Sequence, residues 1–213
     1  MMEARAHPRH WDVSTAVLVL ANSVPVAGVL FFGWKIFPLL LLYWLENVVV
    51  GCFNVLRLAL VDPGNPARWV GKLFLIPFFC FHYGLFAAVH GSFLFALFGP
   101  RKFVDPWGLV SVVPGAIREA GIEFAVLSII VSHGVSFIMN YIHGGEYRRA
   151  SLQQVMGQPY RRVVVLHLAI LGGAFAMMAL GTPLIGLVLL VVLKTGFDVV
   201  AHRAERRKLA GPS

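Results

Sequence analysis

Apolar runs of about 20 residues recur along this chain of 213 residues, and they end at glycine, proline or charged residues. A helix needs about 20 mainly apolar residues to cross a hydrocarbon core of about 30 Å. Only 13% of the residues are charged, about half the charged fraction of an ordinary soluble domain. The pattern therefore excludes a water-soluble globule and predicts an integral membrane protein.

The apolar runs predict an all-α, polytopic membrane protein that forms a single transmembrane domain over residues 1–213. We expect a six-helix transmembrane bundle with an interfacial segment between the third and fourth helices. The first run lacks a small-residue cleavage site, so we interpret it as a retained span. The predicted spans are Val13–Phe32, Ile36–Leu60, Leu73–Phe98, Ala120–Ile142, Val163–Leu180 and Pro183–His202.

Two connecting segments are expected to have some structure of their own. Val104–Glu119 is too short and too interrupted to cross a membrane, and Trp107 is a residue type that anchors segments at the membrane interface. After the fourth span, the sequence predicts a short helix at Glu146–Met156, ended by Gly157 and Pro159.

Basic residues lie mainly on one side of the predicted bundle. Of the 18 Lys and Arg residues, thirteen fall on the side that holds both termini, four fall on the other side, and Lys194 lies inside a span. Because basic loops stay in the cytoplasm, both termini are expected there. The net charge of +8 then reflects topology and contact with anionic lipids, and we expect no nucleic-acid partner.

Polar and ionisable side chains interrupt the predicted spans. A charge at the centre of a span costs roughly 2.5–3.5 kcal/mol on insertion scales, so such residues usually face the bundle interior and carry function. The residues concerned are Glu46, Asn47, His82, His90, Ser132, His133, Asn140, His167, Lys194, Asp198 and His202.

Depth in the bilayer, at about 1.5 Å per residue, places several of these groups in one layer of the cytoplasmic half. We predict a metal site there, with His82, His133, His167, and Asp198 or His202 as ligands. Neutral imidazole and carboxylate supply the lone pairs that zinc or iron requires, and a metal offsets the cost of burying them. Zinc is the favoured cofactor.

The predicted chemistry is hydrolysis of a lipid-like substrate by water activated on zinc. Asp198 would act as ligand or base, and Ser132 or Glu46 would assist. The expected partners are membrane lipids and a lipid-like substrate. The rest of the polar core comprises Asn47, His90, Asn140 and Lys194.

Three other interpretations use the same residues. In a redox protein, two of the histidines would bind haem or iron. In a proton- or cation-coupled transporter, Glu46, His90, His133 and Asp198 would form a path across the midplane. In a purely structural protein, the polar groups would satisfy one another inside the bundle.

Five groups of residues form a pattern over nearly the whole chain. They are Tyr43-Trp44-Leu45-Glu46-Asn47; His82-Tyr83-Gly84 with His90-Gly91; Ser132-His133 with Ser136-Phe137 and Asn140; Pro159-Tyr160-Arg161 with Leu166-His167; and Lys194 with Asp198 and His202. This pattern resembles an uncharacterised family of bacterial multi-spanning membrane proteins, classed as a domain of unknown function. The resemblance implies a location in the bacterial inner (plasma) membrane and implies no activity.

The chain is also similar, more weakly, to intramembrane zinc hydrolases of the alkaline ceramidase type. Those proteins combine histidines from several helices with an aspartate and a serine, in seven spans, and carry a His-x-x-x-His pair. This sequence has six predicted spans and places Asp198 and His202 at that spacing.

Overall fold

The computed structural model describes residues 27–62, 66–100 and 105–180, together with residues 188, 191, 192, 195 and 196; some side chains within these helices lie outside the description. The chain divides into two compact units, Lys35–Leu190 and a unit made of Met1–Trp34 with Val191–Ser213.

In the unit made of Met1–Trp34 with Val191–Ser213, residues 27–32 are helical. A turn follows at Gly33, where φ is +67°. The Trp34 ring then packs so closely on Gly28 that an added Cβ would overlap the ring. Glycine is therefore required at the contact, and the positive φ favours glycine at the turn.

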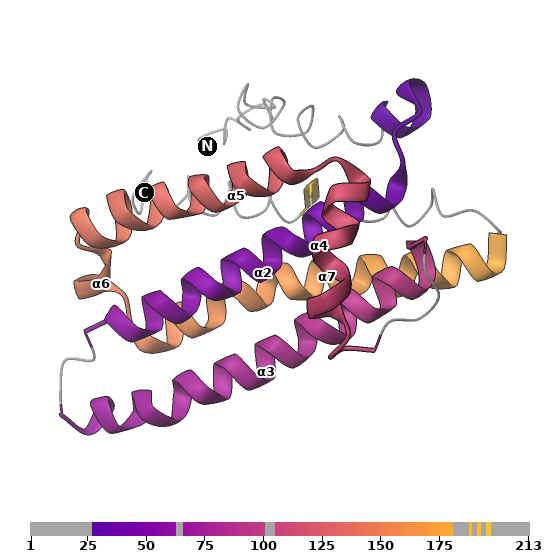
Figure 1. Ribbon diagram of the computed structural model, residues 1–213. Coiled ribbons are helices and arrows are strands. Elements are labelled where there is room, and N and C mark those ends of the chain that lie inside the picture. The colour runs from indigo at the N-terminus through magenta and orange to yellow at the C-terminus, as the bar shows by residue number, and fades with distance from the viewer. Residues whose placement is uncertain are drawn as a thin grey trace, which may run out of the picture. The chain divides into compact units, whose positions relative to one another are not determined.

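All the regular secondary structure in the described part of the first unit is helical, which confirms the all-α prediction. Figure 1 shows the long helices lying along a common direction while a shorter helix, α4, crosses it. The elements are α2 (Ile36–Leu60), α3 (Pro66–Phe98), α4 (Leu109–Ala120), α5 (Glu123–Ser136), the π-helix η1 (Phe137–His143), α6 (Glu146–Arg149) and α7 (Leu152–Leu180).

Among the described residues, three helices are long and apolar enough to cross a membrane, rather than the six predicted. They are Ile36–Leu60, Trp69–Phe98 and Glu123–His143, which correspond to the predicted second, third and fourth spans. The second span has the predicted bounds. The third helix begins earlier than predicted, at Pro66, because proline is favoured in the first turn and the basic residues after it do not interrupt the helix.

The other three predicted spans have different outcomes. Most of Val13–Phe32 and most of Pro183–His202 lie outside the described residues. Val163–Leu180 forms the later part of α7, a helix of 29 residues that is not one of the three.

The helix predicted at Glu146–Met156 is divided in two. Ser151 and Gln154 form a reciprocal capping pair, with Gln154 N donating to Ser151 Oγ at 3.2 Å and Ser151 N donating to Gln154 Oε1 at 3.0 Å. This pair starts a new helix, α7, which runs on through Gly157 and Pro159 instead of ending there.

Helices α2 and α3 run antiparallel. Trp44, early in α2, donates its indole Nε1–H to the carbonyl of Ala87, late in α3, at 2.8 Å. At the opposite end, Lys72 Nζ donates to the carbonyls of Ala59 and Val61 at 2.8 and 2.7 Å. Lys72 thus satisfies the carbonyl groups that the end of α2 leaves unpaired.

Helices α3 and α7 run in the same direction. His82 Nδ1 lies 2.9 Å from the Tyr160 hydroxyl, and further along both helices His90 Nε2 lies 2.6 Å from His167 Nδ1. Their parallel course places two polar pairs at one helix interface.

Helix α2 also runs parallel to α5 and η1. Glu46 Oε1 lies 3.9 Å from His133 Nε2, and the Tyr141 hydroxyl donates to the carbonyl of Arg57 at 2.7 Å. Successive long helices in the order α2, α3, α5 and α7 therefore alternate in direction. Successive membrane crossings require this alternation.

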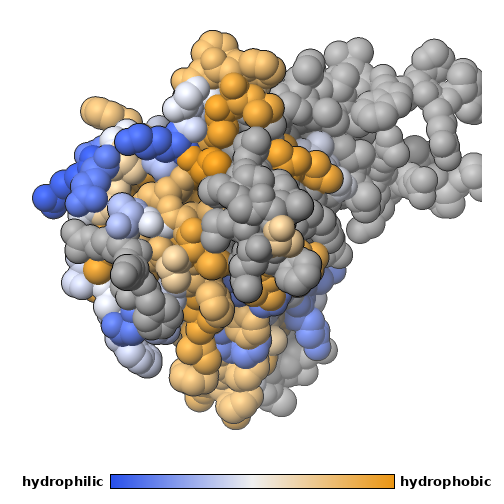
Figure 2. Space-filling view, turned by 90° about the vertical axis from the view of Figure 1, so that its right-hand side faces the viewer, coloured by the Kyte–Doolittle hydropathy of each residue, from blue (hydrophilic) through white to orange (hydrophobic). Residues whose placement is uncertain are grey.

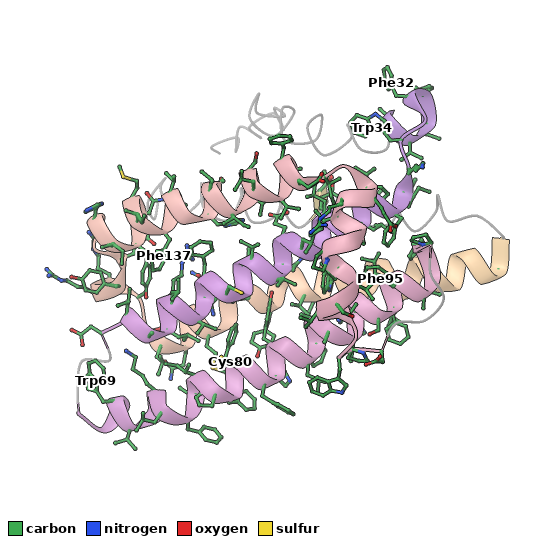
Figure 3. The ribbon with its side chains drawn as sticks, in the orientation of Figure 1. Phe32, Trp34, Trp69, Cys80, Phe95 and Phe137 are labelled. Carbon is green, nitrogen blue, oxygen red and sulfur yellow. The ribbon has the colours of Figure 1, made fainter. Side chains whose placement is uncertain are left out.

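Buried apolar residues join α2, α3 and α7 near the end of the bundle that holds Lys72. Trp69 lies in the first turns of α3 (Figure 3), and its ring is 4.3 Å from Lys72 Nζ. The cluster consists of Leu58, Val61, Phe79, Tyr83, Val155 and Val163.

Large apolar side chains are exposed on the long helices, including Phe74 (70%), Phe81 (71%) and Phe124 (85%). Hydrophobic residues cover much of the coloured surface in Figure 2. Soluble monomers rarely expose apolar surface on this scale, so the bundle fits surroundings of lipid.

The segment before the third candidate span contains α4, which is too short to cross a membrane. Leu109 and Ala116 are buried, whereas Trp107, just before the helix, is 83% exposed. Helix α4 lies almost wholly within the segment Val104–Glu119, whose position at the membrane interface stays a prediction.

Candidate functional site

A pair of histidines joins α3 to α7 inside the bundle. His90 Nε2 lies 2.6 Å from His167 Nδ1, and the ring planes are inclined by 72°. His90 is only 3% exposed. Two imidazoles from different helices thus share one hydrogen bond in a buried setting.

A backbone carbonyl fixes the tautomer of His90. Its Nδ1 lies 2.6 Å from the carbonyl oxygen of Phe86, one turn earlier in α3. Since a carbonyl only accepts hydrogen bonds, His90 Nδ1 carries the proton and Nε2 of the neutral ring carries a lone pair. That lone pair faces His167, whose Nδ1 then donates.

Close helix packing surrounds His90. An added Cβ on the next residue, Gly91, would lie 2.7 Å from the Trp44 ring of α2 and 2.8 Å from Leu109 of α4. The Phe86 ring stacks on the His90 ring, with centroids 6.0 Å apart. Helices α2 and α4 therefore pack closely against α3 beside His90.

A second polar pair lies at the same interface, toward the beginning of both helices. His82 Nδ1 is 2.9 Å from the Tyr160 hydroxyl, and the rings of Phe78 and Phe86 flank His82 with centroids 5.3 and 5.0 Å away. A tyrosine hydroxyl is protonated near neutral pH. It can therefore donate to His82.

The third pair, Glu46 with His133, lies between α2 and α5. Its 3.9 Å separation exceeds a hydrogen bond, and it stabilises the bundle only when His133 is protonated. The Phe53 ring lies beside His133, with centroids 6.3 Å apart. This geometry is that of a half-buried carboxylate and imidazole pair.

The remaining predicted site residues occupy different surroundings. Asn47 Nδ2 donates to the backbone carbonyl of Tyr43 at 2.8 Å. The backbone carbonyl of Asn47 accepts from the Tyr83 hydroxyl at 2.9 Å. Ser132 is exposed, and so is Asn140, which donates to Ser136 Oγ at 3.2 Å. Lys194, Asp198 and His202 lie outside the described residues.

Those predicted ligands that the structure describes do not gather into one cluster. His82, His133 and His167 each face a different partner, and the described residues contain no group of three or more His, Cys, Asp or Glu side chains placed to hold a metal. What the structure brings together is His167 with His90, which the sequence placed only in the wider polar core.

Helical spacing was the signal that could have found this pair. His82 and His90 are eight residues apart, and Tyr160 and His167 are seven apart, so each pair occupies one face of its helix. The estimate of depth in the bilayer did not place His90 beside His167, because α7 starts at Leu152, well before the predicted span.

The sequence profile of one protein family matches residues 4–213, nearly the whole chain, and its description is "Family of unknown function (DUF6498)". This match bears out the resemblance to an uncharacterised family. No curated protein and no solved structure matches the chain.

Proposed function

Because the chain belongs to the DUF6498 family of unknown function, whose description assigns no activity, we propose from the geometry that it is an integral membrane protein with a transition-metal site at His90 and His167. The observation that carries the proposal is the contact from His90 Nδ1 to the Phe86 carbonyl. Histidines that bind metals usually donate their other ring N–H to a carbonyl or carboxylate, which fixes the tautomer and aims the lone pair.

Zinc fits this pair with a small adjustment. Two imidazole nitrogens bound to one tetrahedral zinc ion lie about 3.3 Å apart, given zinc–nitrogen bonds of about 2.0–2.1 Å. The nitrogens of His90 and His167 are 2.6 Å apart, so the rings must separate by about 0.7 Å. His167 must also change tautomer, so that its proton lies on Nε2 and Nδ1 offers a lone pair to the metal.

His82 and His133 then hold helices together rather than bind the metal. His82 is satisfied by Tyr160, and His133 lies beside Glu46. Among the described residues, neither joins His90 and His167 in a group of three that could hold a metal ion.

The same carbonyl argues against a proton path through His90. A relay needs an acceptor that can take up a proton on each side of the imidazole, and the Phe86 carbonyl cannot. The direct contact also argues against axial haem ligation, since the macrocycle would have to lie between the two nitrogens, which are 2.6 Å apart.

Hydrolysis of a lipid-like substrate is the proposed reaction class. A zinc ion with an open position supplies Lewis acidity and a water that ionises near neutral pH. The protein would position the ion in a buried layer reached by lipid acyl chains.

The proposed setting is a bacterial inner membrane, crossed six times with both termini in the cytoplasm. Three helices of sufficient length and the alternating directions of α2, α3, α5 and α7 support it.

Cysteine labelling at two exposed serines tests this topology. The serines are Ser111 in α4 and Ser151 before α7. In a background with both native cysteines replaced, Ser111→Cys should react with an impermeant maleimide in intact cells, and Ser151→Cys only after permeabilisation. The reverse result would refute the topology.

Elemental analysis of detergent-purified protein tests the metal site. We expect about one zinc or iron per chain in the parent, and loss of most of it in His90→Ala and His167→Ala. His143→Ala, at an exposed histidine, is the matched control and should keep its metal. A parent protein that purifies and folds without metal, and that binds no added zinc, would refute the proposal.

A further inference from the structure

Two buried hydrogen-bond donors on α2 have no acceptor among the described residues. They are Nδ2 of Asn54 and Nε of Arg57. Asn54 is only 2% exposed. Because the two residues are three apart in a helix, their side chains lie on neighbouring parts of one face.

The rest of the Arg57 guanidinium is held in place by neutral groups. Nη1 donates to Gln158 Oε1 at 3.3 Å, and the guanidinium carbon lies 5.4 Å from the centre of the Tyr141 ring. The Tyr141 hydroxyl also donates to the backbone carbonyl of Arg57. Within the described part of the chain, the ion pair observed joins Glu46 to His133 and does not involve this guanidinium.

Unpaired buried donors are rare in folded proteins, and each needs an explanation such as a bound water, ion or ligand. A water molecule would satisfy the amide of Asn54 but would bring no negative charge to Arg57. An anionic oxygen group would satisfy both donors and the charge, and guanidinium groups pair especially well with phosphate.

The location favours such a group. Arg57 lies in the last turn of α2, close to the end of the bundle that also holds Lys72, Arg148 and Arg149. The sequence predicts that this end faces the cytoplasm, where anionic lipid headgroups attract basic residues.

We infer that Asn54 and Arg57 form a binding site for a phosphate group, which Asn54 Nδ2 and Arg57 Nε contact together. The phosphate belongs either to a lipid headgroup of the cytoplasmic leaflet or to a free phosphate. The site is separate from His90 and His167, and neither proposal depends on the other.

The test measures binding of three probes to detergent-purified protein in phosphate-free buffer. The probes are dioctanoyl phosphatidic acid, inorganic phosphate and dioctanoylglycerol, which lacks phosphate. We expect at least one phosphate probe to bind and dioctanoylglycerol not to bind. Tighter binding of the phosphatidic acid identifies a lipid headgroup, and tighter binding of inorganic phosphate identifies free phosphate.

Three variants connect binding to the two donors. Asn54→Leu removes the amide, and Arg57→Lys keeps the charge but removes Nε, so each should weaken binding by about tenfold or more. Arg118→Gln, at an exposed arginine on α4, is the matched control and should bind like the parent. Equal affinity in all four proteins, or no binding of either phosphate probe to the parent, would overturn the inference.

A further substitution, at Asn54, separates loss of phosphate binding from loss of folding. Asn54→Asp has the same shape and places a carboxylate where it can pair with Arg57. It should abolish phosphate binding and raise the midpoint of thermal unfolding in phosphate-free buffer. An Asn54→Asp protein that still binds phosphate as the parent does would also overturn the inference.

Discussion

The Nε2 atom of His90 accepts a hydrogen bond from Nδ1 of His167 across the interface of α3 and α7, at 2.6 Å. The Phe86 carbonyl holds the other side of His90 and thereby fixes which nitrogen carries its lone pair. The contact has one consequence for stability and another for metal binding, and the two can be measured separately.

For stability, removing either imidazole leaves a buried partner without its hydrogen bond. We expect His90→Ala and His167→Ala each to lower the free energy of unfolding in detergent by about 1–3 kcal/mol. In a double-mutant cycle on metal-free protein, the two changes should show a coupling of about 0.5–1.5 kcal/mol. Additive effects within about 0.3 kcal/mol would mean that the two histidines do not interact.

The packing beside His90 should tolerate no added methyl group. Gly91→Ala places a Cβ 2.7 Å from Trp44 and 2.8 Å from Leu109, so we expect a loss of about 1–3 kcal/mol from overpacking. Gly84→Ala is the matched control on the same helix, because its Cβ meets nothing within 4 Å. That change should be neutral or should stabilise the helix by up to about 1 kcal/mol. Equal unfolding midpoints for the two variants would contradict the packing described.

Lys72 should stabilise the end of α2 through its two carbonyl contacts. Lys72→Met keeps most of the side-chain volume but leaves the carbonyls of Ala59 and Val61 without this donor. We expect it to lower the free energy of unfolding by about 1.5–3 kcal/mol, as for hydrogen bonds to a charged group. Lys35→Met, at an exposed lysine before α2, is the control and should change stability by less than about 0.5 kcal/mol. A Lys72→Met protein as stable as this control would show that the cap contributes nothing.

The sequence predicted the parts of the fold that depend on apolar length. The predicted span Ile36–Leu60 has the bounds of α2, because a continuous apolar run lies between Lys35 and Asp62. The start of α7 was missed because it depends on a local hydrogen-bond exchange between Ser151 and Gln154, which matters more there than the apolar pattern.

The site was less predictable than the fold. Composition and span position correctly singled out His82, His90, His133 and His167 as buried or half-buried polar residues. Which of them meet depends on how far α3 and α7 slide along each other, and no pattern within one helix contains that information. Lys72 shows the same limit, since the sequence indicated a topological charge and the structure adds a helix cap.

X-ray absorption at the edge of the bound metal tests the central claim most directly, because it reports the atoms around the ion itself. We predict a first shell that includes at least two imidazole nitrogens at about 2.0–2.1 Å in the parent protein. His167→Ala should lose one imidazole from that shell, or lose the metal, while His143→Ala keeps the parent spectrum. A metal shell without imidazole, or one that His167→Ala leaves unchanged, would contradict the proposed site.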